Sequence, residues 1–320
     1  MSVLVYIDVA DKKIKKPSLE AASYGSRISD GNATAVVLGE LEVGEIEKLG
    51  EYGIGKVLHS SDSRFNNFDS SAYTKAVAKA AEQVNAKTVI LSFNQNGKAL
   101  GPRLSVRLKA GYIPGAASMP DANGLISKSV FSGKAIAHYK VNSDKSVIGL
   151  GLNSVPPVKE SGTAAIEPFD AGLSDGDFTT TVTAVNKIQG QIPLTEADIV
   201  VSAGRGLKGP ENWGMIEELA TELNAATACS RPVADVGWRP HHEHVGQTGV
   251  TVKPNLYFAI GISGAIQHLA GVNSSKTIVV INNDSEAPFF KAADYGIVGD
   301  AFDVVPKLIE SMKKFNAANE

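Results

Sequence analysis

The feature that most constrains the fold of this 320-residue chain is a regular alternation of short apolar runs with helical segments. In the first half, strands are predicted at Val3–Ile7, Thr34–Leu38, Lys56–His59 and Thr88–Leu91, with helices between them at Ser18–Ile28, Val43–Tyr52 and Ala72–Val84. Strands separated by helices of this length need crossover connections, which are right-handed and place the strands parallel. The first half is therefore predicted to contain a mainly parallel sheet.

The alternation is interrupted in the middle of the chain and then resumes. Leu125–Lys140 and Val147–Leu152 have the pattern of hairpin strands and predict an antiparallel extension. Val185–Glu196 combines a Gly, a Pro and polar residues, which is typical of a linker. After it, strands are predicted at Ile199–Ser202, Leu256–Ile262 and Thr277–Ile281, with helices at Glu211–Leu223, Ala265–Ala270 and Val304–Phe315.

These patterns predict an α/β protein of two domains, which suits its length. Residues 1–186 are expected to form an N-terminal domain with a mainly parallel sheet and the antiparallel extension. Residues 187–320 are expected to form a doubly wound C-terminal domain. Such a sheet binds its ligand at the carboxyl ends of the strands.

Composition argues against several functional classes. The formal net charge is −3 and basic residues are scattered, so nucleic-acid binding is not expected. Cys229 is the only cysteine, which excludes intrachain disulfides and thiolate metal cages. No apolar run reaches the ~20 residues that cross a bilayer, and the first residues lack the pattern of a secretory signal. We expect a cytoplasmic protein without membrane insertion.

Two glycine-containing segments follow predicted strands. In Ser202–Lys208 the glycines can let the backbone approach a ligand, although a plain strand-to-helix turn has the same pattern. In Gly261–His268, Ser263 can cap a helix and Gly264 leaves the first N–H groups open to a phosphate. His268 can point toward the same ligand, but a lone His in an apolar helix is more often a core residue.

Two further segments have a functional and a structural interpretation. Val245–Gly249 can place its backbone against a flat ring while the Thr248 hydroxyl reaches an edge atom, or it can be a hairpin turn. In Cys229–Pro232, Arg231 can supply a permanent positive charge to a reduced, anionic cofactor. The alternative is an ion pair between Arg231 and Asp235.

The cluster His241–His244 (HHEH) invites a metal interpretation. Neighbouring residues in extended chain point to opposite faces, and no other spaced ligand group accompanies the cluster. We therefore predict no metal site. No nucleophile elbow or Cys/His pairing indicates covalent catalysis.

Taken together, six stretches resemble the alpha subunit of electron transfer flavoproteins in order and spacing. They are GRGLKGPEN (Gly204–Asn212), SRPVADVGW (Ser230–Trp238), VGQTG (Val245–Gly249), VKPNLYFAIGISGAIQHLAG (Val252–Gly271), INNDSEAPFF (Ile281–Phe290) and ADYGIVGD (Ala293–Asp300). The first half is similar more loosely, through LEAASYGSRIS, AVVLGE, GKALGPRLSVRLKAG and SGKAIA.

The resemblance implies that FAD binds to the C-terminal domain. It places the following residues at the cofactor: Arg205, Ser230, Arg231, Val245, Gly246, Gln247, Thr248, Ser263, Gly264, Ala265, Ile266, Gln267, His268, Asn282 and Asp300. Ser263 is expected at the pyrophosphate, and Asn282 and Asp300 at the ribose and adenine end. Thr248 would donate to flavin N5.

By the same resemblance, His268 and Arg231 lie near the pyrimidine side or the face of the flavin ring. One-electron reduction leaves negative charge around N1 and C2=O of the ring. A nearby His or Arg stabilises that charge.

The resemblance also implies partners. The N-terminal domain is expected to dock onto a beta subunit that binds AMP or a second FAD, and the C-terminal domain to swing about Val185–Glu196. The heterodimer would accept electrons from flavin dehydrogenases, such as the acyl-CoA dehydrogenases of fatty acid oxidation. It would pass them to a quinone oxidoreductase or another acceptor, as a carrier rather than a self-sufficient enzyme. The sequence leaves open whether the complex also bifurcates electrons.

Three positions depart from the family pattern. Ala203 replaces a common glycine, Gly97–Leu100 replaces Gly-Arg-Asp-Leu, and His244 stands where many relatives have Gln. His244 lies beside the expected flavin loop, and no role is carried over to it.

Two other classes of protein are alternatives. An enzyme whose second domain binds NAD or thiamine diphosphate would need acid and base residues in a cleft, which the sequence does not reveal. A nucleotide-binding module without a redox role is the other alternative. The visible spectrum of the purified protein separates these classes.

Overall fold

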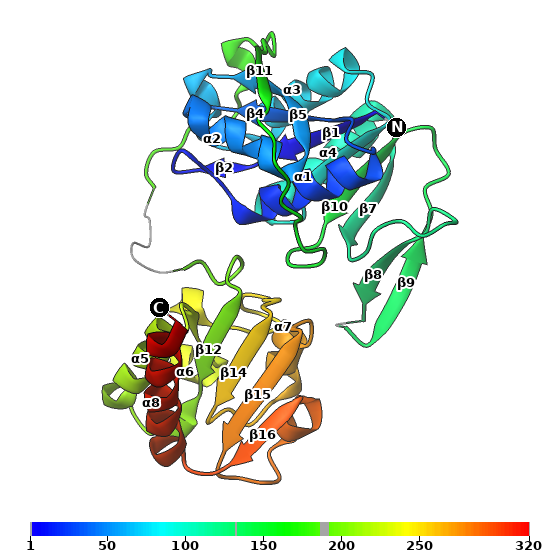
Figure 1. The fold of residues 1–320 in the computed structure, drawn as a ribbon. Coiled ribbons are helices and arrows are strands. Elements are labelled where there is room, and N and C mark those ends of the chain that lie inside the picture. The colour runs from blue at the N-terminus through cyan, green and yellow to red at the C-terminus, as the bar shows by residue number, and fades with distance from the viewer. Residues whose placement is uncertain (1, 132, 186–191, 320) are drawn as a thin grey trace. The chain divides into compact units, whose positions relative to one another are not determined.

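The computed structural model of the chain describes residues 2–131, 133–185 and 192–319, which divide into two compact units (Figure 1). The N-terminal unit contains residues 2–130 and 136–185, and the C-terminal unit contains residues 192–319 together with residues 131 and 133–135. The boundary predicted between residues 186 and 187 lies outside the described residues, as do residues 186–191 of the predicted linker.

The N-terminal unit is built on a parallel sheet whose described strands follow the order β11-β5-β4-β1-β6-β10-β7. These strands are β1 Val3–Ile7, β4 Ala33–Leu38, β5 Ile54–Ser60, β6 Thr88–Ser92, β7 Gly111–Ala116, β10 Ser146–Leu150 and β11 Ala165–Pro168. Along β1, Val3, Val5 and Ile7 enter the core on one face, while Leu4 and Tyr6 enter the core on the other. Burial on both faces is typical of a parallel sheet covered by helices.

Helices cover both faces of this sheet (Figure 1). α1 (Lys16–Ile28) and α2 (Val43–Glu47) pack against one core, and α3 (Ser70–Gln83) and α4 (Gln95–Leu108) pack against the other. A short antiparallel pair, β2 (Val9–Ala10) with β3 (Lys13–Ile14), follows β1. The 3-10 helices of the chain are Lys48–Tyr52, Ser63–Asn66, Asp175–Asp177, Arg205–Leu207, Pro210–Asn212, His241–Glu243 and Pro288–Ala292.

The predicted hairpin region contributes to two different sheets. β8 (Ile126–Val130) and β9 (Ala135–Tyr139) form a separate two-stranded sheet. Val147–Leu152 was expected as a hairpin strand, and this was wrong, because β10 lies between β6 and β7 and is parallel to both. In that place β10 makes backbone hydrogen bonds on both edges, whereas a hairpin strand would have made them mainly to its neighbour in sequence.

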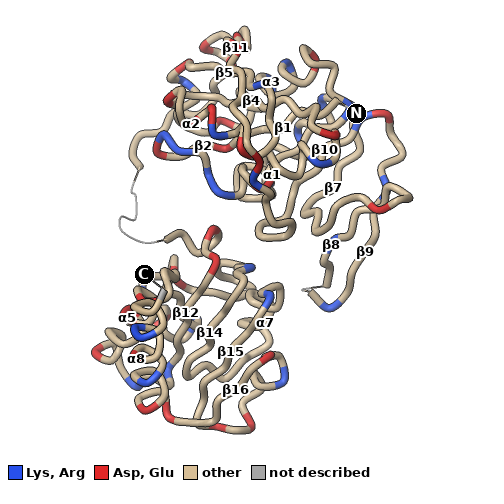
Figure 2. The backbone as a smooth tube through the Cα atoms, viewed as in Figure 1, with Lys and Arg blue, Asp and Glu red and all other residues tan. Residues whose placement is uncertain are grey.

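The C-terminal unit has a parallel sheet in the order β13-β12-β14-β15-β16 among the described residues. Its elements are β12 Ile199–Ala203, α5 Gly214–Glu222, β13 Ala226–Cys229, α6 Arg231–Asp235, β14 Leu256–Ile260, α7 Ile266–Val272, β15 Thr277–Asn282, β16 Tyr295–Val298 and α8 Ala301–Asn319. The strands β12, β14 and β15 carry no charged residue, and Figure 2 shows charges gathered on the helices and loops instead. α5 and α8 belong to the core on one face, and α7 to the core on the other. This is the predicted doubly wound fold.

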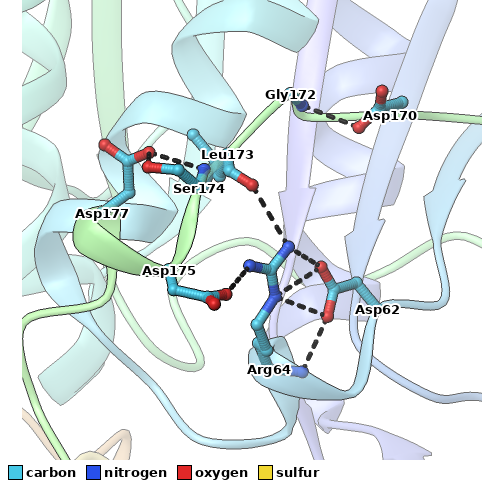
Figure 3. A network of polar contacts seen from close by, with 8 residues as sticks. All are labelled: Asp62, Arg64, Asp170, Gly172, Leu173, Ser174, Asp175 and Asp177. Carbon is cyan, nitrogen blue, oxygen red and sulfur yellow. Dashed lines mark hydrogen bonds and ion pairs between the residues drawn. The ribbon is translucent and has the colours of Figure 1, made fainter.

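A segment of the N-terminal unit that leads toward residue 185 is held by ion pairs (Figure 3). Arg64 bonds Asp62 and, through a second nitrogen, Asp175 at 2.6 Å, and it also donates to the carbonyl of Leu173 at 3.2 Å. Lys75 on α3 pairs with Asp177. These contacts join residues 173–177 to α3 and to the loop before it.

Asp69 makes the next contact along the same segment. One carboxylate oxygen caps α3 by accepting from the N–H groups of Ser71 and Ala72, at 2.8 and 3.0 Å. The other accepts from the N–H groups of Thr179 and Thr180, each at 2.8 Å. Burial acts to raise the pKa of Asp69, but these hydrogen bonds outweigh it and lower the pKa to about 2.

We predict that Asp69→Ala destabilises the first turn of α3 and releases residues 179–180. Loss of an N-cap costs about 1–2 kcal/mol, which hydrogen exchange of the α3 amides will measure. The pKa of Asp69 is lower in the fold, so its contribution is present above the unfolded value of 3.8 and is lost as pH falls toward about 2. Asp175→Ala, at a 97% exposed side chain, is the control and should leave the α3 amides unchanged. Equal exchange in wild type and Asp69→Ala would contradict the prediction.

Candidate functional site

A cavity of about 420 Å³ opens at the carboxyl edge of the C-terminal sheet. It is lined by Arg205, Ser230, Arg231, Pro232, His244, Val245, Gln247, Thr248, Gly261, Ile262, Ser263, Ala265, Gln267 and His268. The strand order changes direction between β12 and β14, and the turns after these two strands both line the cavity. Open α/β sheets bind ligands at such a switch point.

The N-terminal sheet has its own switch point, between β1 and β6, but side chains bridge it. Asp8, which follows β1, accepts hydrogen bonds from Asn94 at 2.7 Å and Asn96 at 3.1 Å, both of which follow β6. Lys15 pairs with the same carboxylate at 3.1 Å. Asp8 is 3% exposed, so the switch point between β1 and β6 is bridged by hydrogen bonds within the chain.

Glycines bring the turns after β12 and β14 into backbone contact. Gly204 donates to the Ile260 carbonyl at 2.9 Å, and Gly206 donates to the Gly261 carbonyl at 3.1 Å. Gly261 has a φ of +61°, and a Cβ there would lie 2.9 Å from the Cα of Gly206. A side chain at either glycine would therefore separate the two turns.

The loop that carries Thr248 is docked against α7 in a similar way. Val245 donates to the Cys229 carbonyl at 3.1 Å, and Gln247 donates to the Gln267 carbonyl at 2.7 Å. A Cβ on Gly271 would lie 2.5 Å from the Cα of Gly246. These contacts hold the loop against α7 and Cys229 at the edge of the cavity. The loop is therefore not an isolated hairpin turn.

The segment from Ser263 to Gln267 presents a row of unpaired donors. Within the described residues, the backbone N–H groups of these five residues have no acceptor in the chain. Gly264 has a φ of +88°, and a Cβ there would lie 2.5 Å from the Phe289 nitrogen. Successive free N–H groups in such a turn form a concave site for an anion.

His268 lies on the buried side of the cavity and is 6% exposed. Its Nε2 is 2.9 Å from the Tyr257 hydroxyl, and its ring meets Phe289 edge-on. Its Nδ1 has no hydrogen-bond partner among the described residues. Burial, with a smaller contribution from His244, lowers the pKa of His268 to about 4, so the imidazole is neutral at pH 7. The Val245 backbone acts weakly in the opposite direction, but it does not reach hydrogen-bond geometry with Nδ1.

His244 is a second buried imidazole in the cavity lining, at 8% exposed. Burial is the main reason that its pKa is lowered; Asp235 opposes this, and Arg231 adds to it. Sequence reasoning noted His244 only as a departure from a family pattern. Its burial depends on an isolated parallel bridge between Cys229 and His244, which no local sequence signal reveals.

The position of Arg231 is compatible with both of its interpretations. It lines the cavity, and its Nε also lies 3.3 Å from the Asp235 carboxylate, one helical turn away on α6. Both side chains are more than half exposed. Exposed pairs of this kind contribute little to stability.

The structure brings most of the predicted FAD residues together in this cavity. Those that line it are Arg205, Ser230, Arg231, Val245, Gln247, Thr248, Ser263, Ala265, Gln267 and His268. Predicted residues outside the lining are Gly246, Gly264, Ile266, Asn282 and Asp300. Gly246 and Gly264 instead make the close backbone contacts described above.

The remaining two polar residues have partners in the chain. Asn282 donates to the Ile262 carbonyl at 3.0 Å and so supports the floor of the cavity. Asp300 accepts from the N–H of Phe302 at the start of α8 and lies 3.6 Å from Lys208.

Four lining residues were not among the predicted cofactor residues, namely Pro232, His244, Gly261 and Ile262. Pro232, Gly261 and Ile262 adjoin predicted residues in motifs that the sequence analysis had singled out. The signal for them was therefore present in the same motifs.

Within the His241–His244 segment, Glu243 is paired with an arginine. Glu243, 1% exposed, accepts two hydrogen bonds from Arg239, at 2.8 and 2.6 Å. His241 and His242 are exposed. No group of three or more His, Cys, Asp or Glu side chains gathers as a metal site in the described part of the chain.

Burial raises the pKa of Cys229 to about 12.

Two family models match the chain. The electron transfer flavoprotein domain matches residues 3–174, and the electron transfer flavoprotein FAD-binding domain matches residues 193–273. The second range contains the whole cavity lining. The chain belongs to the electron transfer flavoprotein alpha-subunit family.

Curated relatives in this family align along almost the full chain. An electron transfer flavoprotein subunit alpha from Bacillus subtilis (strain 168) is 37% identical over 98% of this chain and 98% of its own. One from Syntrophomonas wolfei is 36% identical over 97% and 98%, and one from Mycobacterium leprae 33% over 97% and 98%. A solved structure of a putative thiamin diphosphate-dependent enzyme from Mycobacterium smegmatis aligns over 91% of this chain and 62% of its own, at 10% identity. Its TM-score is 0.24, which is too low to indicate a shared fold.

The residues present fit FAD, the cofactor that the family implies. Five free N–H groups at Ser263–Gln267 suit a diphosphate, and the buried Nδ1 of His268 lacks a partner that a ring edge can supply. The cavity volume lies within the range of ligand sites.

Among the described helices, none is both long and apolar enough to traverse a bilayer.

We predict that Gly271→Ala weakens FAD binding, because the added methyl group would push Gly246 and the Thr248 loop away from α7. Overpacking of this kind costs about 1–3 kcal/mol, so the dissociation constant should rise about tenfold or more. Quenching of flavin fluorescence on titration measures it. Gly214→Ala is the matched control, since no atom lies within 4 Å of its added Cβ. Equal affinities of the two variants would show that the contact does not shape the site.

Proposed function

We propose that this chain is the FAD-carrying subunit of a heterodimeric electron carrier. It accepts electrons from flavin dehydrogenases, such as acyl-CoA dehydrogenases, and passes them to a quinone oxidoreductase or another acceptor. Its partner is a beta subunit that binds AMP or a second FAD, and the N-terminal unit docks onto that subunit. When bound, FAD supplies the redox chemistry, and the protein positions it and sets its potential.

One observation carries the proposal: a single cavity gathers a row of free N–H groups, an exposed Thr248, the cation Arg231 and the imidazole His268. We assign the N–H row at Ser263–Gln267 to the pyrophosphate and Thr248 to flavin N5. His268 and Arg231 are assigned to the pyrimidine side of the ring. Two residues beyond the cavity, Asn282 and Asp300, are assigned to the ribose and adenine end.

The cavity also counts against the rival enzyme classes. Within the described residues its lining contains no Asp or Glu, and its titratable groups with lowered pKa values are the two imidazoles His244 and His268. The described lining therefore offers no carboxyl group for acid or base catalysis on a substrate of an NAD- or thiamine-dependent enzyme. A lining of amide N–H groups, hydroxyls and nitrogen bases suits a site that holds a cofactor and stabilises negative charge.

Movement between donor and acceptor is assigned to the segment Val185–Glu196. On its N-terminal side, Asp69 holds Thr179 and Thr180 against the N-terminal unit. Within the segment, near its C-terminal end, Leu194 packs against the core of the C-terminal unit. These contacts limit the proposed pivot to the residues between them. A domain that swings allows one flavin to meet two proteins in turn.

We expect the purified heterodimer of this chain with its beta subunit to show a visible flavin spectrum. Acid extraction followed by chromatography should give one FAD for each copy of this chain, counted apart from any nucleotide in the beta subunit. A folded, colourless heterodimer that gains no flavin band when FAD is added would contradict the proposal.

We expect His268→Ala to lower the potential at which bound FAD takes its first electron. A hydrogen bond to a charged group contributes roughly 1.5–3 kcal/mol, which is on the order of 60–130 mV for one electron. His268→Gln, which retains a donor, should recover part of the loss, and the exposed His242→Ala should behave as wild type. Potentiometric titration measures all four proteins. Unchanged potential in His268→Ala would refute the assigned role.

A further inference from the structure

His244 is an imidazole in the cavity that the proposed function does not use. A Cβ on Gly249 would lie 2.8 Å from its Nδ1, and a Cβ on Gly246 would lie 3.4 Å from its Nε2. The ring therefore packs against the two glycines that flank Gln247 and Thr248. Neither ring nitrogen makes a hydrogen bond to another residue in the part of the chain that the structure describes.

The charged and titratable groups around His244 come from three elements. α6 contributes Arg231 and Asp235, the 3-10 helix before the loop contributes His241, and α7 contributes His268. Burial is the largest influence and lowers the pKa of His244, Asp235 opposes it, and Arg231 and His241 lower it further. His244 is thus neutral at pH 7 before any negative charge enters the cavity.

We propose that His244 takes up a proton from solvent when FAD in this cavity is reduced. The inference rests on the proposed function and deepens it. The electron comes from the donor flavin dehydrogenase and goes to the isoalloxazine ring. The proton goes from water to a ring nitrogen of His244, and no bond forms between His244 and the cofactor. Negative charge added close to a buried imidazole favours its protonated form.

His268 is less suited to this role than His244. Its Nε2 is already engaged with the Tyr257 hydroxyl, and its pKa of about 4 means that a large change is needed to protonate it near pH 7. Neither nitrogen of His244 has a partner among the described residues, and His244 lies in the same loop as Thr248, which is assigned to the redox-active edge of the ring. Proton uptake at His244 would compensate charge there.

The test is the pH dependence of the potential for the first electron, measured on the FAD-loaded heterodimer from about pH 5 to 8. Below the His244 pKa of the oxidised protein, which lies under 6.5, both redox states hold the proton and no slope is expected. Between that value and the raised value of the reduced state, each pH unit should change the reduction equilibrium tenfold, which is about 59 mV for one electron. The potential should fall as pH rises.

His244→Gln should lose this slope, whereas His241→Gln should keep it, because His241 is exposed and does not line the cavity. The same slope in His244→Gln and wild type overturns the proposal, and so does a wild-type potential that is constant over the range. Should the Gln variant not retain FAD, His244→Asn takes its place, and the wild-type result still decides. A heterodimer that binds no FAD instead overturns the proposed function, which the flavin content shows before any potential is measured.

Discussion

The C-terminal unit depends on close backbone contact between turns that follow different strands. Gly206 meets Gly261, and Gly246 meets Gly271, at separations where a Cβ would approach backbone atoms within 3 Å. Because these contacts are made by main chain, the shape of the cavity does not depend on the rotamers of flexible side chains. The free N–H row at Ser263–Gln267 exists for the same reason, since the turn that holds it is fixed by Gly264 against Phe289.

The polar side chains that line the cavity lie at two depths. Arg205, Arg231, Thr248 and Ser263 are exposed at the rim, whereas His244 and His268 are buried. A rim that is open to solvent suits exchange of electrons with a protein partner, because the reacting edge must come close to that partner. Buried imidazoles respond strongly to charge because little water screens them. The two requirements of the proposed carrier are therefore met by different layers of one site.

Much of the fold could be predicted from the sequence, because parallel strands buried on both faces give continuous apolar runs. Prediction missed β13 and β16, whose sequences Ala226–Cys229 and Tyr295–Val298 are short, and β16 is exposed throughout. It also missed α4, whose pattern is obscured by Gly97, Gly101 and Pro102. The partner of β10 could not be predicted, since its place between β6 and β7 is decided by sheet pairing between segments distant in sequence. The cavity was predicted better, since its residues lie in a few glycine-containing motifs, but the burial of His244 depends on a bridge between two of those motifs.

The two sheets of this chain show what a switch point needs before it can hold a ligand. In the N-terminal sheet, Asp8 has its oxygens engaged by Asn94, Asn96 and Lys15, so its charge and hydrogen-bonding capacity are satisfied within the chain. In the C-terminal sheet, the equivalent edge leaves backbone donors and the Nδ1 of His268 without partners among the described residues. A buried polar group that stays unpaired is costly, so the Nδ1 of His268 indicates a partner from outside the chain. The backbone donors belong mostly to exposed residues, which an anion from solvent can reach. The same topology therefore gives a switch point that is bridged by side chains within the chain in one unit, and a cavity lined by backbone donors in the other.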